Sequence, residues 1–122
     1  MQSSAVVTLI AKRIDSDVSA TNGETLKMNI QATHRQQVDD ERVRVTRWDF
    51  APGAETGFHV HEFPYVITYL TDARMEILDK TTGSSFVDMK AGESYSRPKG
   101  IAHNVINAGA KPMAFVEVEI KL

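Results

Sequence analysis

His59 and His61 are the residues of this sequence whose types and spacing best suit chemistry, because a single residue separates them in a segment that reads as a strand. Alternate side chains of a strand point to the same face, so the two imidazoles would lie side by side. Two neutral ring nitrogens on one face can bind a metal ion at about 2.0–2.1 Å each. By itself the pair also fits two polar residues on an exposed face, so the surrounding pattern has to decide between the two interpretations.

Two sets of residues with fixed spacings surround this pair. The first places five residues between Gly53 and His59, and one residue between His59 and His61. The second set consists of Gly92, Pro98, Gly100, His103 and Asn107. Both spacings match the two motifs of the cupin superfamily, in the same order, and the chain resembles that superfamily. Glycine frees the backbone at barrel corners, and a proline ends a strand before a tight turn.

The resemblance implies an all-β fold, a double-stranded β-helix or jelly-roll barrel, with a metal site inside it. The site would consist of His59, His61 and His103, the third histidine arriving on a different strand. Three neutral imidazoles leave the charge of a divalent ion uncompensated, so we expect the site to attract a small anionic ligand. Such a donor set suits a divalent transition metal (Fe, Zn, Ni or Cu) better than magnesium or manganese.

One position departs from the cupin pattern. In cupins, three or four residues usually separate the second histidine from a glutamate. In this sequence Tyr65 and Val66 stand at those two positions. Glu62 is the nearest carboxylate and a weaker alternative ligand, because it neighbours His61 in sequence and is expected to point to the opposite face. Tyr65 takes the inward position. It either contacts the metal or its bound water, or fills the pocket beside it.

Further pocket residues are expected on two strands. Tyr95 and Arg97 alternate with serines just before the second-motif turn, and the resemblance implies that such positions lead into the site. Arg97 is then either a clamp for a substrate carboxylate or a surface arginine. Tyr69 is in phase with Tyr65 and belongs either to the same cavity or to the core.

The chain from residue 38 to 122 has the pattern of a barrel of short strands. We expect these at residues 43–50, 58–61, 65–70, 74–78, 85–89, 94–97, 103–106 and 113–122, with glycine or proline in most connections. In the last strand, Glu117 and Glu119 alternate with valines, so we expect the valines to face the core and the glutamates the solvent.

Residues 1–37 read as an extension that adds strands to the barrel of its own chain or of a partner. Residues 5–14 are apolar, Asn22-Gly23 is a turn signal, and residues 25–32 alternate like a strand. The polar residues 36–42 are expected to be a connection. Because an unpaired edge strand invites association, we expect a homodimer.

Composition excludes several classes of function. The chain has 122 residues, 42% hydrophobic and 25% charged, with a net charge of −2 and no cysteine. This balance argues against nucleic acid as a partner, and the lack of cysteine excludes disulfides and thiolate chemistry. No apolar run is long enough for a membrane span, and no signal-peptide pattern is present, so we expect a cytoplasmic protein.

Within the superfamily, the chain looks most like small bacterial single-domain cupins, some of them linked to β-alanine degradation. The segments VRVTRWDFAPGAETGFHVHEF, AGESYSRPKGIAHNVIN and FVEVEIK carry this likeness. The preferred hypothesis is a metal-dependent enzyme of dioxygenase or isomerase/hydrolase type, acting on a small carboxylate-bearing substrate. The alternatives are a binding or sensing module without catalysis, and a structural role in a larger assembly.

Overall fold

The computed structural model describes residues 29–122, and within them every regular element is a strand. The strands are β1 (Ile30–Gln31), β2 (Thr33–Asp39), β3 (Val43–Phe50), β4 (Ala54–Glu55), β5 (His59–Val60), β6 (Tyr65–Tyr69), β7 (Ala73–Asp79), β8 (Gly83–Met89), β9 (Ser94–Arg97), β10 (Ala102–Asn107) and β11 (Met113–Ile120). No helix in the described part is long and apolar enough to cross a membrane.

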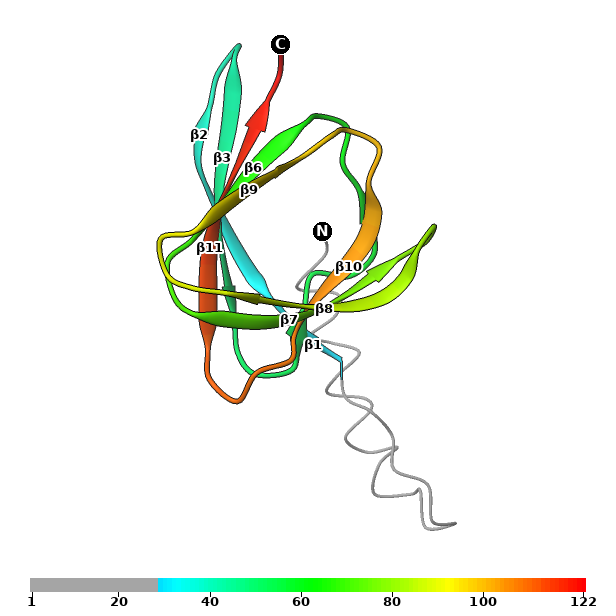
Figure 1. The fold of residues 1–122 in the computed structure, drawn as a ribbon. Coiled ribbons are helices and arrows are strands. Elements are labelled where there is room, and N and C mark those ends of the chain that lie inside the picture. Colours follow the sequence, from blue (N-terminus) through cyan, green and yellow to red (C-terminus); the bar gives the residue numbers. More distant parts are fainter. Residues whose placement is uncertain (1–28) are drawn as a thin grey trace.

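The strands form two sheets that enclose a common interior (Figure 1). One sheet has the order β2-β3-β11-β6-β9, and the other has the order β1-β4-β10-β7-β8, with β5 also paired to β10. Sequence neighbours such as β9 and β10 therefore lie in different sheets. This arrangement is the double-stranded β-helix expected from the sequence, and it confirms the predicted fold class.

The core is set by the alternation of side chains on the inner faces of the strands. On β3, Trp48 and Phe50 are buried, and Phe50 lies opposite Met113 of β11. On β6, Tyr65, Ile67 and Tyr69 alternate with partly exposed residues. The same alternation runs through β11. Every second side chain after Met113 therefore also faces the interior.

Strand β2 was not expected from the sequence, which predicted a connection over residues 36–42. All its residues are exposed, yet it pairs antiparallel with β3 along its length, with a bulge between Gln36 and Val38. On one side, the backbone hydrogen-bonding groups of β2 pair with those of β3. Polar side chains suit a strand at the edge of a sheet. The expected boundary between residues 37 and 38 falls inside this strand. The apolar segment at 5–14 and the Asn22-Gly23 turn lie outside the described residues.

The orientation of β11 corrects the sequence prediction. Glu117 and Glu119 are each only 8% exposed and face the interior, while Val116 and Val118 lie on the outer face. Phe115 and Met113 fix this phase, because they are buried in the core and share a face with both glutamates. The interior therefore contains two carboxyl groups that the alternation alone assigned to solvent.

Candidate metal centre

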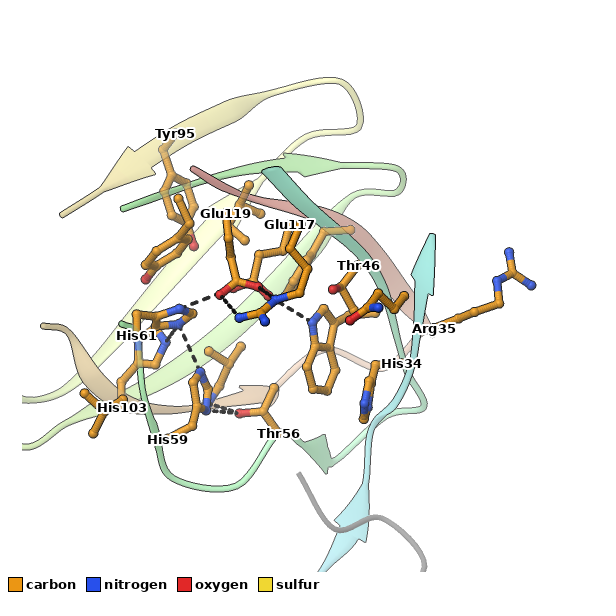
Figure 2. Close-up of a pocket in the computed structure, with 18 residues that line it drawn as sticks. His34, Arg35, Thr46, Thr56, His59, His61, Tyr95, His103, Glu117 and Glu119 are labelled. Atoms are coloured by element: carbon orange, nitrogen blue, oxygen red, sulfur yellow. Dashed lines mark hydrogen bonds and ion pairs between the residues drawn. The ribbon is translucent and has the colours of Figure 1, made fainter. Parts of the chain in front are cut away.

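Pairing between β5 and β10 brings the first and third histidines together. His59 lies directly opposite His103 in this antiparallel pair, so both side chains project from the same face. The Nε2 atom of His61 is 3.0 Å from that of His59 and 3.1 Å from that of His103. One ligand atom from each histidine lies within 4.8 Å of the others. The structure thus brings the three predicted residues to one point (Figure 2).

The short loop before β5 fixes the orientation of His59. The Nδ1 atom of His59 is 2.8 Å from the carbonyl oxygen of Gly57. Gly57 has a φ of +82°, a left-handed conformation that glycine adopts without steric cost. The side chain of Asn104 on β10 accepts a hydrogen bond of 3.0 Å from the Gly57 amide. A carbonyl can only accept, so Nδ1 of His59 holds the hydrogen and its Nε2 lone pair points to the site.

His61 is held from three sides. Its backbone amide donates to the carbonyl of Ile101 at 2.9 Å, and its carbonyl accepts from the amide of Gly100 at 2.7 Å. The Tyr65 ring stacks on its imidazole with centroids 3.8 Å apart. Its Nδ1 atom faces Oε2 of Glu117 at 3.4 Å. The second-motif turn therefore locks the backbone of His61 as well as delivering His103.

The spacing of the nitrogens fits a transition-metal ion. Two nitrogens bound to one ion at about 2.1 Å lie about 3.0 Å apart at a right angle and about 3.4 Å apart at a tetrahedral angle. The observed separations of 3.0 and 3.1 Å are close to the right-angle value. One imidazole hydrogen cannot serve both contacts of His61 Nε2, so convergent lone pairs explain this cluster better than mutual hydrogen bonding.

The histidines are arranged to be neutral. Burial lowers the pKa of His61 to about 3, with the nearby His59 and His103 adding to the effect. Burial also lowers the pKa of His103 to about 4 and, in direction, that of His59. Neutral imidazoles are the form that binds metal ions, and each offers a lone pair at neutral pH.

The histidines lie in the wall of a cavity of about 640 Å³ between the sheets, a volume suited to a small molecule. The five-stranded sheet contributes another part of the wall, which includes Trp48, Phe115, Glu117 and Glu119. His34 stacks on Trp48 with ring centroids 4.6 Å apart and, although exposed, lines the cavity as well. Arg35 also borders the cavity, but its side chain points away from it (Figure 2).

The other residues predicted for the site are divided by the structure. Tyr65 and Tyr95 line the cavity. Tyr69 lies in the core instead, where its hydroxyl donates to the sulfur of Met75 at 2.9 Å. Arg97 is exposed and is not part of the cavity wall, although it lies on the same strand as Tyr95. Its positive charge still acts on the site, because it tends to lower the pKa values of Tyr65 and His103. Glu62 is also exposed and outside the wall, with an oxygen 3.4 Å from the Arg44 guanidinium.

Sequence reasoning missed the polar groups that the five-stranded sheet contributes to the cavity wall. Arg44 forms a two-pronged pair with Glu119, with nitrogen–oxygen distances of 2.7 and 3.0 Å. Glu117 accepts a hydrogen bond of 3.3 Å from Nε1 of Trp48. Burial, with the charge of Glu119 adding to it, raises the pKa of Glu117 to about 7. One feature of the sequence could have placed Glu117 and Glu119 inside the barrel: they alternate in phase with Phe115, a large apolar residue that is expected to be buried.

The comparison with protein families agrees with the fold and the motifs. The family described as "Cupin domain" matches residues 46–119, which is more than half of the chain. The chain belongs to the cupin family. It is 48% identical, over 91 residues, to the beta-alanine degradation protein BauB of Pseudomonas aeruginosa; the match covers 75% of this chain and 95% of that protein.

Solved structures show the same likeness. A cupin domain from Bordetella pertussis Tohama I is 41% identical, with a TM-score of 0.75, and the match covers 80% of this chain and 99% of that one. The polyketide cyclase RemF from Streptomyces resistomycificus is 23% identical, with a TM-score of 0.62, over 75% of this chain and 66% of that one. The second likeness concerns the fold alone.

Proposed function

We propose that this cupin is a metal-dependent enzyme that acts on a small, carboxylate-bearing substrate. The observation that carries the proposal is the convergence of three neutral imidazoles in the wall of a small-molecule-sized cavity. His59, His61 and His103 would hold a divalent transition metal. When bound, such an ion polarises a substrate oxygen, or activates water or dioxygen, which corresponds to reactions of the isomerase/hydrolase or dioxygenase type.

The features of the cavity favour a ligand whose negatively charged group lies at the three histidines. Three neutral ligands leave a divalent ion with its full positive charge, and an anionic group would offset it. Of the two arginines that border the cavity, Arg44 is already paired with Glu119 and Arg35 points away from the cavity, as Figure 2 shows. Arg97 is outside the wall. We therefore assign the attraction for a carboxylate to the metal position rather than to an arginine clamp. The likeness to a protein of β-alanine degradation makes small amino and carboxylic acids the first compounds to test.

The protein groups around the site would orient the substrate and restrict water. Tyr65 packs its ring on His61, and its hydroxyl is buried without a hydrogen-bond partner among the described residues. Burial raises the pKa of this hydroxyl above its ordinary value of 10.0, so Tyr65 stays protonated near neutral pH. In that form it can donate a hydrogen bond to a ligand but cannot act as a base.

The test is turnover by protein reconstituted with Fe(II), Ni(II), Zn(II) or Cu(II) in separate samples. Each sample is incubated with β-alanine and with carboxylates of about two to five carbons, while dioxygen consumption and product formation are followed. We expect turnover with at least one metal and one acid, and none in the His103→Ala variant. Loss of activity in the variant alone would assign the reaction to this site. Equal product formation by both proteins would contradict the proposal.

A binding or sensing role is the second candidate. It is favoured by the state of the carboxyl groups in the wall, because Glu119 is paired with Arg44 and Glu117 is engaged by Trp48 and His61. Neither is free to transfer a proton without breaking these contacts. A metal-loaded protein that binds one of the acids at micromolar concentration without converting it would favour this candidate over the enzyme.

A further inference from the structure

We infer that Glu117 is a positioning residue for the metal site, acting through His61 from behind the ligands. The inference rests on the proposed metal site and assigns a role to a buried carboxyl group on β11, outside both sequence motifs. In this role Glu117 selects the tautomer of His61 and offsets part of the charge of a bound ion. Trp48 in turn holds Glu117 in place.

The contacts form a chain from the core to the site. Oε2 of Glu117 faces Nδ1 of His61 at 3.4 Å, while Oε1 accepts from Nε1 of Trp48 at 3.3 Å. All three side chains are at least nine-tenths buried. A buried carboxyl group is costly unless its partners are fixed, and here both named partners belong to the cavity wall.

The chemistry of the imidazole gives this contact a direction. A carboxylate that faces Nδ1 favours the tautomer with its hydrogen on Nδ1, which leaves the lone pair on Nε2. For His61 that lone pair points at the Nε2 atoms of the other two histidines. The same outcome is produced at His59 by the neutral carbonyl of Gly57. Nδ1 of His103 is buried without a partner among the described residues.

Charge distinguishes Glu117 from its neighbour Glu119. Glu119 lies two residues further along β11 and faces the same interior, but its carboxylate is neutralised by the guanidinium of Arg44. Among the described residues, Glu117 forms no ion pair with a lysine or an arginine, and the charged-group contact it has is with His61. Of the two interior carboxyl groups, Glu117 is the one without an arginine partner, so its deprotonated form can offset the charge of an ion held by neutral imidazoles.

The pair Glu117→Gln and Glu119→Gln therefore tests the inference with a matched control. Both changes remove one buried carboxylate from the same face of β11 and keep its shape. Metal-free proteins, checked for folding by circular dichroism, are titrated with Ni(II) and Co(II) by calorimetry. We expect Glu117→Gln to weaken binding by about 10- to 100-fold, the range found for changes behind metal-bound histidines. Glu119→Gln should weaken binding by less than Glu117→Gln does, because among the described residues Glu119 pairs with Arg44 and Glu117 is the carboxyl group that faces a histidine.

A spectrum separates a positioning role from a structural one. In the Co(II) form, Glu117→Gln should shift the visible absorption bands, because a less basic His61 donates less to the ion. Glu119→Gln should leave the bands in place. If Glu117→Gln does not fold, Trp48→Phe becomes the decisive variant: it removes the hydrogen bond to Glu117, and we expect binding to weaken by several-fold.

The outcomes distinguish the two proposals. Wild-type protein that binds neither ion would overturn the proposed metal site itself. Wild-type protein that binds, together with a Glu117→Gln affinity and spectrum equal to those of wild type, would overturn only the role of Glu117. If Glu117→Gln does not fold, a Trp48→Phe variant whose metal affinity equals that of wild type would likewise overturn the role of Glu117. Equal losses in Glu117→Gln and Glu119→Gln would also overturn it, because the effect would then not depend on contact with His61.

Discussion

At the scale of single residues, the three histidines differ in what supports them. His59 rests against a backbone carbonyl, His61 against a carboxyl group and an aromatic ring, and Nδ1 of His103 against neither. All three are shielded from water by the sheets, and their low pKa values follow mainly from that burial. The site therefore depends on the folded barrel to keep imidazoles neutral and close together.

This burial predicts how the stability of the metal-free protein depends on pH. The folded-state pKa values of His61 and His103, about 3 and about 4, lie below the ordinary 6.5. The unfolded chain thus takes up protons first as the pH falls below about 6.5, and stability is lost toward pH 4. Glu117 acts in the opposite direction, because its pKa is raised from 4.5 to about 7, but it is one group against three histidines. We expect the urea midpoint in the presence of a chelator to be lower at about pH 5 than at about pH 7.

The control for this prediction is His103→Gln, which removes one of the buried imidazoles. The difference between the two urea midpoints should become smaller in this variant. A wild-type urea midpoint that stays constant or rises on acidification would show that the imidazoles do not dominate the pH dependence of stability.

The ligands were predictable from the sequence, whereas the groups behind them were not. The spacing of His59, His61 and His103 carries the site because fixed intervals in a strand and a turn fix direction. Glu117 belongs to a strand in which both faces are partly apolar, so alternation cannot say which face is buried. The wrong assignment of Glu117 and Glu119 to solvent follows from that ambiguity, and only the packing of Phe115 resolves it.

At the scale of elements, loops position the ligands as much as strands do. His59 begins the two-residue strand β5, and its ring orientation depends on the conformation of Gly57 just before it. Short pairing of this kind supplies few hydrogen bonds, so a change in the loop should be transmitted directly to the histidine.

Gly57→Ala tests this dependence against Gly83→Ala at the start of β8. The two glycines have nearly equal φ values, +82° and +84°, and a Cβ at either position meets nothing within 4 Å. Each substitution should therefore destabilise the fold by a similar amount, about 1–2 kcal/mol. Only Gly57→Ala should also weaken metal binding, measured by calorimetry. Equal affinities of the two variants would mean that the loop does not set the position of His59.

The element that sequence reasoning missed was β2. Its residues lack the apolar alternation that identifies half-buried strands, because every residue is exposed. What makes it a strand is pairing with β3, a long-range contact that no local pattern records. By contrast, the predicted limits of β3 and β9 agree with the structure, because apolar residues or turn signals mark both ends.

At the scale of the whole molecule, the outer face of the five-stranded sheet carries aliphatic side chains on adjacent strands. Val118 lies between Val45 on β3 and Val66 on β6, and all three are only partly buried. We propose that the protein is a homodimer and that this face contributes to the interface. Val118→Lys should then lower the mass measured by light scattering at micromolar concentration, because it places a charge amid apolar contacts.

Ser94→Lys at the edge strand β9 is the control, since it adds the same charge away from the valines. A version lacking residues 1–28 tests whether the segment before the described strands is needed for association. A monomeric wild-type protein would refute the dimer. A dimer that is unaffected by Val118→Lys but lost on truncation would move the interface to the N-terminal segment.

Metal removal should leave the barrel folded. The core includes Phe50, Tyr69 and Met113, and it meets the site at Tyr65, which stacks on His61. Apolar burial should dominate stability. We expect a chelator to lower the melting temperature while leaving the far-ultraviolet circular dichroism at room temperature unchanged. Unfolding by the chelator at room temperature would identify the site as structural.

The central claim, a metal site made of His59, His61 and His103, is tested most directly by metal content. Wild-type protein and the variants His61→Ala, His103→Ala and His34→Ala are stripped, reloaded with one transition metal, passed through a desalting column and analysed for bound metal. We expect about one ion per chain for wild type and for His34→Ala, and nearly none for the other two variants, all of them folded. Equal metal content in wild type and in His61→Ala and His103→Ala would contradict it.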